Sequence, residues 1–93
     1  MGKTILIVDD SSIMRKMIKE TLKSAGHDVI GEAKNGSDAV ALYTSLKPDL
    51  VTMDITMRGM DGFEAARQIL NDDRDACIIF LSNLDEAQYS QEA

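Results

Sequence analysis

Three aspartates stand directly after short apolar segments of the sequence. Asp9 and Asp10 follow the apolar residues 5–8, and Asp54 follows residues 50–53. The carboxyl ends of parallel strands meet at one edge of a sheet, so these carboxylates converge if the two segments are neighbouring strands. Carboxylates that close repel one another, and a bound cation removes that repulsion. The sequence therefore predicts a cation site at this edge, with Asp9, Asp10 and Asp54 all as ligands.

The chemistry open to such a site is phosphoryl transfer. Oxygen-only ligands favour a hard ion, and Mg²⁺ suits best because it keeps several waters and accepts a phosphate oxygen. A carboxylate beside that ion can attack phosphorus and form an aspartyl phosphate. Ser82, directly after the last predicted strand, is placed to donate a hydrogen bond from its hydroxyl to the phosphoryl group.

Each of these residues also has a simpler interpretation. Asp9 and Asp10 could only cap a helix, and Asp54 could only terminate a strand. Ser82 taken alone is more typical of a turn. Aspartates follow an apolar segment at both strand ends, and this repetition is harder to explain by chance. It favours the shared site.

The elements that must position these residues alternate along the chain. Apolar and β-branched runs predict strands over residues 5–8, 29–33, 50–54 and 77–81. Caps and helical spacing predict helices over residues 12–25, 36–46 and 63–70, with Gly26 and Pro48 ending the first two. This alternation predicts an α/β fold with a parallel sheet, right-handed crossovers and helices on both faces.

Two smaller predictions concern burial. The first helix carries one apolar face, which predicts that this face packs on the core or on a partner; its residues are Ile13, Met14, Met17, Ile18, Leu22 and Ala25. Cys77 is predicted to open a buried strand and to be inert, because no neighbouring cysteine or histidine offers metal-ligand spacing.

Length and charge limit the possible functions. The 93 residues fit one domain, and the net charge of −6 disfavours direct binding to nucleic acid. The single cysteine excludes an internal disulfide and favours a reducing, cytoplasmic location. The apolar runs are too short to indicate a membrane segment or a signal peptide, so no membrane partner is expected.

Three motifs together resemble the response-regulator receiver family of two-component signalling, in particular its single-domain chemotaxis type, which is similar to CheY. They are LIVDDSS at residues 6–12, MDITM at residues 53–57 and MDG at residues 60–62. The resemblance implies a flavodoxin-like, doubly wound parallel sheet with strand order 2-1-3-4-5.

The resemblance also implies a role for each matching residue. Asp54 corresponds to the phosphoacceptor, Asp9 and Asp10 to acidic Mg²⁺ ligands, Thr56 to a further ligand through its backbone carbonyl, and Ser82 to the switch hydroxyl. The implied function is a phosphorelay switch that accepts a phosphoryl group from a histidine kinase and then alters its binding to a protein partner. Such a protein catalyses only its own phosphoryl transfer, and the sequence does not name the downstream target.

The chain departs from the family pattern at three places. Arg58 stands where the family usually has proline, and Asn83 where it usually has a small residue. The last lysine is Lys47, so nothing matches the family's strand-five lysine. We therefore expect residues 1–93 to form a receiver domain that is incomplete at the C-terminus and lacks the fifth strand and helix.

These departures keep other functions open. One is a pseudo-receiver that binds partners without phosphorylation and forms a homodimer or domain-swapped dimer through its incomplete sheet, with an open edge at residues 77–81. Another is an aspartate-nucleophile phosphohydrolase, which is disfavoured because Thr56 stands where such enzymes carry a second aspartate. A flavin-binding flavodoxin is weaker still, since the acidic loop after the first strand would repel a flavin phosphate.

Overall fold

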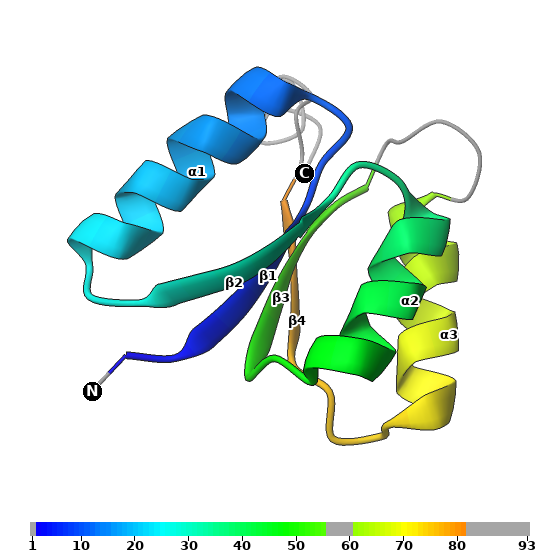
Figure 1. Cartoon of the computed structure of the whole chain (residues 1–93). Coiled ribbons are helices and arrows are strands. Elements are labelled where there is room, and N and C mark those ends of the chain that lie inside the picture. The colour runs from blue at the N-terminus through cyan, green and yellow to red at the C-terminus, as the bar shows by residue number, and fades with distance from the viewer. Residues whose placement is uncertain (1, 56–60, 82–93) are drawn as a thin grey trace, which may run out of the picture.

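Four parallel strands form the sheet that positions the aspartates. The computed structural model describes residues 2–55 and 61–81. Its strands are β1 (Thr4–Val8), β2 (Asp28–Ala33), β3 (Leu50–Asp54) and β4 (Ile78–Leu81), arranged in the order β2-β1-β3-β4 (Figure 1). This order confirms the doubly wound arrangement for the four strands described.

The register of β1 against its neighbours sets the geometry at the carboxyl edge. Val8 is the partner of Ala33 in β2 and of Met53 in β3. Asp9 directly follows Val8, and Asp54 directly follows Met53. The two aspartates therefore lie next to each other at the carboxyl ends of adjacent strands. The sheet thus brings together residues that are 45 positions apart in the sequence.

Helices cover both faces of this sheet (Figure 1). Helix α1 (Ser12–Ser24) lies over one face, and α2 (Gly36–Leu46) and α3 (Gly62–Asp72) lie side by side over the other. Each begins at a polar cap, because the side chains of Ser11, Asn35 and Asp61 accept hydrogen bonds from the first-turn amides. Helix α2 ends at Leu46 and is capped by Lys47, which has a left-handed φ of 46° just before Pro48.

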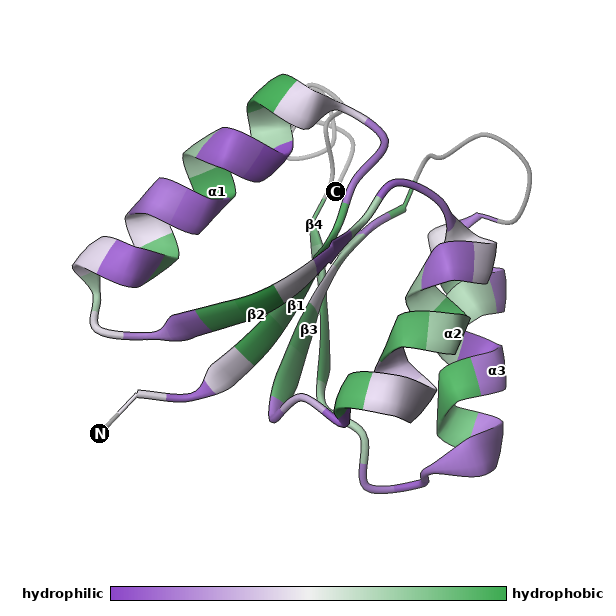
Figure 2. Cartoon of the chain, in the orientation of Figure 1, coloured by the Kyte–Doolittle hydropathy of each residue, from purple (hydrophilic) through white to green (hydrophobic). Residues whose placement is uncertain are grey.

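The core lies between the sheet and the pair α2 and α3. Leu6 and Val8 of β1 are at most 1% exposed and pack with Val51 and Met53 of β3 against Ile69 of α3. The strands are largely apolar, while hydrophilic residues recur along each helix (Figure 2). Both β1 and β3 are therefore fixed on this face up to the residue before each aspartate.

The apolar face of α1, predicted to pack on the core or on a partner, is covered only in part by the described chain. Ile13 is 71% exposed, Met17 is 56% exposed and Ala25 is exposed, whereas Met14, Ile18 and Leu22 are partly buried. Packing of the exposed part on a partner stays a prediction. Helix α1 packs over β1 and β2, and the described residues place no second helix beside it on that face. An apolar stripe in the sequence identifies a helix face but not how much of that face is covered.

The prediction that Cys77 opens a buried strand was wrong, whereas its inertness is not tested by the structure. Cys77 is exposed and precedes β4, which begins at Ile78. Within the described sheet β4 pairs only with β3, and Ile79, Phe80 and Leu81 are 46%, 38% and 36% exposed. The homodimer remains a prediction.

Across residues 2–55 and 61–81, no helix is both long and apolar enough to cross a membrane.

Candidate metal and phosphoacceptor site

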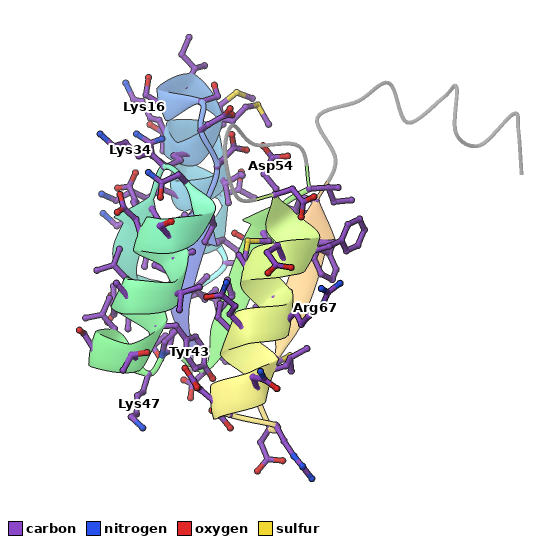
Figure 3. The ribbon with its side chains drawn as sticks, turned by 90° about the vertical axis from the view of Figure 1, so that its right-hand side faces the viewer. Lys16, Lys34, Tyr43, Lys47, Asp54 and Arg67 are labelled. Atoms are coloured by element: carbon purple, nitrogen blue, oxygen red, sulfur yellow. The ribbon has the colours of Figure 1, made fainter. Side chains whose placement is uncertain are left out.

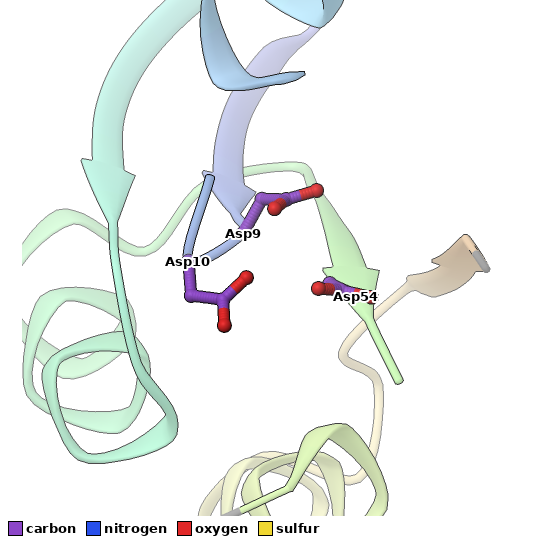
Figure 4. A group of neighbouring side chains, drawn as sticks. All are labelled: Asp9, Asp10 and Asp54. Carbon is purple, nitrogen blue, oxygen red and sulfur yellow. The ribbon is translucent and has the colours of Figure 1, made fainter. Parts of the chain in front are cut away.

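The three predicted aspartates lie together at the carboxyl edge of the sheet (Figure 4). Asp9 and Asp54 are each 1% exposed, and Asp10 is exposed. One carboxylate oxygen from each residue lies within 4.8 Å of the others. Two of these acids are therefore buried beside each other, and the third closes the group on the solvent side.

The turn after β1 holds Asp9 through its backbone and its side chain. The Asp9 amide donates to the Ala33 carbonyl of β2 at 3.0 Å, which continues the β1–β2 pairing by one residue. The Ser11 amide donates to Asp9 Oδ1 at 2.9 Å, and the Ser11 side chain accepts from the Met14 amide at 3.3 Å to begin α1. Asp10 lies between these two anchored residues.

Arg15 of α1 also reaches this turn. Its Nη1 donates to the backbone carbonyl of Asp9 at 2.7 Å, and its Nε donates to Glu32 Oε1 in β2 at 3.2 Å. Lys19, one turn further along α1, lies 3.4 Å from the second carboxylate oxygen of Glu32. No sequence pattern pointed to Arg15, because its partners are fixed by tertiary packing and not by a local motif.

The backbone beyond Asp54 is anchored on two sides. The Ile55 amide donates to the Leu81 carbonyl of β4 at 3.2 Å, and the Ile55 carbonyl accepts from the Gly62 amide at 2.9 Å. A Cβ atom on Gly62 would overlap the backbone carbonyl oxygen of Asp54 and lie 2.9 Å from the Ile55 Cα. The start of α3 therefore packs directly on the Asp54–Ile55 backbone, which is the physical use of the glycine in the MDG motif.

The donor set suits a small hard cation. Mg²⁺ holds its oxygen ligands at about 2.0–2.1 Å, so two ligands of one ion lie roughly 3–4 Å apart. Oxygens within 4.8 Å reach that separation by a small side-chain rotation or through an intervening water. Exposed Asp10 leaves one side open to solvent, which fits an ion that retains waters and admits a phosphate oxygen.

Two predicted site residues, Thr56 and Ser82, lie outside the described residues, as do Arg58 and Asn83. The structure therefore brings together Asp9, Asp10 and Asp54.

Comparison with known proteins assigns the family. The response regulator receiver domain family matches residues 5–93. The chain belongs to this family.

Its relatives include chemotaxis proteins. The chain is 52% identical over 82 residues to the chemotaxis protein CheY of Thermotoga maritima, covering 88% of this chain and 68% of the relative. It is 51% identical over 82 residues to CheY of Bacillus subtilis, with the same two coverages. The chain spans about two thirds of the length of these CheY relatives.

The fold of this receiver chain agrees with a solved structure of the same kind. The crystal structure of the CheX–CheY–BeF3–Mg²⁺ complex from Borrelia burgdorferi matches with a TM-score of 0.85 and 35% identity. The match covers 96% of this chain and 68% of that chain. The CheY-like arrangement expected from the motifs is thus confirmed.

A second polar cluster lies at the opposite end of the domain (Figure 3). The Tyr43 hydroxyl of α2 donates to Asp73 Oδ2 at 2.7 Å, beside a shallow pocket of about 100 Å³ that Lys47 also lines. Burial, reinforced by this hydrogen bond, raises the pKa of Tyr43 to about 12. The same bond lowers the pKa of Asp73. The two side chains are hydrogen-bond partners of each other, so this cluster joins α2 to the end of α3.

Proposed function

We propose that this receiver chain is a Mg²⁺-dependent phosphoacceptor switch, with Asp54 as the residue that is phosphorylated. The convergence of Asp9, Asp10 and Asp54 at the ends of β1 and β3 carries the proposal. Buried Asp54 sits where a phosphoryl group can approach from the open side of the cluster. We further propose residues 1–93 as the receiver unit that contains this site.

In the proposed reaction all three carboxylates belong to the metal site, and Asp54 is also the nucleophile. An oxygen of Asp54 forms a bond to phosphorus while the bond from phosphorus to the donor's leaving group breaks, and the donor keeps that electron pair. Asp9, Asp10 and Asp54 would hold Mg²⁺, which when bound neutralises charge on the transferred group. We assign the Thr56 carbonyl as a further ligand and the Ser82 hydroxyl as the switch donor, both on the family motifs.

The surroundings of each aspartate suit its proposed role. Asp9 accepts a hydrogen bond from the Ser11 amide, which limits its rotation and suits a fixed metal ligand. Exposed Asp10 can exchange water for a cation without opening the core. Asp54 ends a strand held on both sides by β1 and β4, so its carboxylate has a defined direction of attack.

The relatives support a signalling role and suggest its partners. Two relatives that are 52% and 51% identical to this chain are chemotaxis proteins called CheY. The Borrelia burgdorferi complex contains CheX, BeF3 and Mg²⁺ together with CheY. We propose a histidine kinase as phosphodonor and a protein as the output partner. Chemotaxis is the pathway that these names favour.

Intact-mass measurement after incubation with acetyl phosphate and Mg²⁺ tests the proposed function. We expect one phosphoryl adduct on the native chain, and none after chelation of Mg²⁺ or in Asp54→Asn. Asp28→Asn is the matched control, because Asp28 is an exposed acid at the opposite end of β2 and its substitution makes the same charge change. An adduct that persists in Asp54→Asn would refute the assignment. Absence of any adduct on the native chain would favour the pseudo-receiver.

A further inference from the structure

Arg15 links α1, β2 and the acidic turn through one guanidinium group. Its side chain is 18% exposed, which is low for an arginine on a surface helix. Nη1 donates to the Asp9 carbonyl at 2.7 Å, and Nε donates to Glu32 at 3.2 Å. A planar guanidinium fixes the directions of these two bonds relative to each other.

The carbonyl that Arg15 contacts controls the direction of the neighbouring acid. This carbonyl belongs to the peptide plane that joins Asp9 to Asp10. The Asp9 amide is already bound to Ala33, so fixing the carbonyl sets where the Asp10 Cα and its side chain leave the strand. Asp10 is exposed and has little packing of its own, so its carboxylate depends on this backbone direction.

Glu32 explains why Arg15 binds the carbonyl and leaves the carboxylates available. A guanidinium near three carboxylates would ordinarily pair with one of them. Here the recorded ion pair of Arg15 is with Glu32, which in turn also lies 3.4 Å from Lys19. The ion pair with Glu32 of β2 therefore neutralises the charge of Arg15. The hydrogen bond from Arg15 to the Asp9 carbonyl then affects the site by fixing the direction of that peptide group.

We propose that Arg15 is a positioning residue for the divalent cation: held by Glu32, it orients the Asp9–Asp10 peptide so that both carboxylates face Asp54. This inference rests on the proposed function, because it assigns Arg15 to the same metal site. Residues of this kind, which contact a ligand residue and not the metal, commonly change metal affinity 10- to 100-fold when they are replaced.

Charge and geometry predict opposite outcomes for the loss of Arg15. If Arg15 acted only through its charge, removing a cation near the site would strengthen Mg²⁺ binding. If it positions Asp10, removing it weakens Mg²⁺ binding even though the repulsion is relieved. The direction of the change therefore separates positioning from electrostatics, and a general loss of stability would produce neither change in a folded variant.

Amide chemical shifts at Asp10 and Asp54, followed as Mg²⁺ alone is added, measure this affinity. We expect Arg15→Met to bind Mg²⁺ about tenfold or more weakly. Arg15→Lys keeps the charge but not the planar pair of donors, so it should also bind more weakly. Lys19→Met is the matched control, since Lys19 shares Glu32 but makes no recorded contact with Asp9; its affinity should equal or slightly exceed that of the native chain.

The outcomes separate this inference from the proposed function. If the native chain binds Mg²⁺ and Arg15→Met binds it equally or more tightly, the role of Arg15 is overturned and the metal site is left intact. If Arg15→Met does not give a folded spectrum before Mg²⁺ is added, Arg15→Lys decides, and native affinity there overturns the role. No Mg²⁺ binding by the native chain overturns both proposals.

Discussion

Gly62 packs its backbone directly against the carbonyl of Asp54, so the first residue of α3 touches the candidate phosphoacceptor strand. The Gly62 amide also donates to the Ile55 carbonyl at 2.9 Å. A side chain on residue 62 has no space, because the atoms it would meet are backbone atoms of Asp54 and Ile55, which cannot rotate away. The distance between α3 and the site is thereby set by the absence of a Cβ atom.

Replacing Gly62 by alanine should therefore damage both stability and the site. We expect Gly62→Ala to lower the free energy of unfolding by about 1–3 kcal/mol, as forced overpacking does, and to shift the Asp54 amide resonance. Denaturant titration and amide spectra measure these effects.

Gly31→Ala is the control for this prediction. Its added Cβ would meet the end of the Leu46 side chain at 2.7 Å, and Leu46 is 37% exposed and can move. We expect a smaller loss of stability there and no shift at Asp54. Equal effects from the two alanines would contradict the special role of Gly62.

Without metal, the clustered carboxylates should destabilise the fold. Replacing Asp9 by asparagine removes one buried negative charge while its Oδ1 can still accept from the Ser11 amide. We expect Asp9→Asn to raise the free energy of unfolding in chelator by on the order of 1 kcal/mol, and to lose the stabilisation that Mg²⁺ gives the native chain. Thermal melts with and without Mg²⁺ test this, with Asp28→Asn as the charge-matched control. If Asp9→Asn were less stable than the native chain in chelator, repulsion among the three carboxylates would not be what limits stability without metal.

The hydrogen bond between Tyr43 and Asp73 should give a pH-dependent contribution to stability. The pKa of Tyr43 is raised from 10.0 to about 12, so its contribution is complete below pH 10 and is lost as the pH rises through about 12. The pKa of Asp73 is lowered from 3.8, so its contribution is present above that pH and declines as the pH falls below it.

Tyr43→Phe should consequently differ most from the native chain between about pH 4 and pH 10. Denaturant unfolding across the pH range gives the difference in unfolding free energy, which we expect to shrink at both ends. Because phenylalanine keeps the ring, this difference isolates the hydroxyl group, and a difference that is constant from acid to alkaline pH would contradict the hydrogen bond to Asp73 as its cause.

Cys77 should react readily in the folded protein, since its side chain is exposed. We expect a small alkylating reagent to modify it stoichiometrically under native conditions and to leave cooperative unfolding intact. Protection of Cys77 in the native chain that disappears in denaturant would contradict its exposed position.

The convergence of the aspartates was predictable because it depends on short-range rules. Apolar runs ending in acid predicted the ends of β1 and β3, and parallel strands place such ends at one edge. The strand order came from the resemblance of the motifs to receiver domains. The roles of Asp9, Asp10 and Asp54 as ligands and phosphoacceptor stay predictions until they are measured.

What the sequence could not predict depends on packing between distant elements. Arg15 and Glu32 are 17 residues apart, and no local pattern shows that they meet beside Asp9. The exposure of Met17 and Cys77 depends on what covers a helix face or a strand, which periodicity does not report. Gly62 was visible within a motif, but its contact with the Asp54 carbonyl follows only from the placement of α3.

Identification of the phosphorylated residue tests the central claim most directly. After reaction with acetyl phosphate and Mg²⁺, borohydride reduction converts an aspartyl phosphate to homoserine, and peptide mass spectrometry then locates it. We predict homoserine at position 54 alone, with none formed when Mg²⁺ is chelated. Homoserine at position 9 or 10, or at position 54 without any need for Mg²⁺, would contradict the assignment of Asp54 as the phosphoacceptor of a Mg²⁺ site that all three aspartates form.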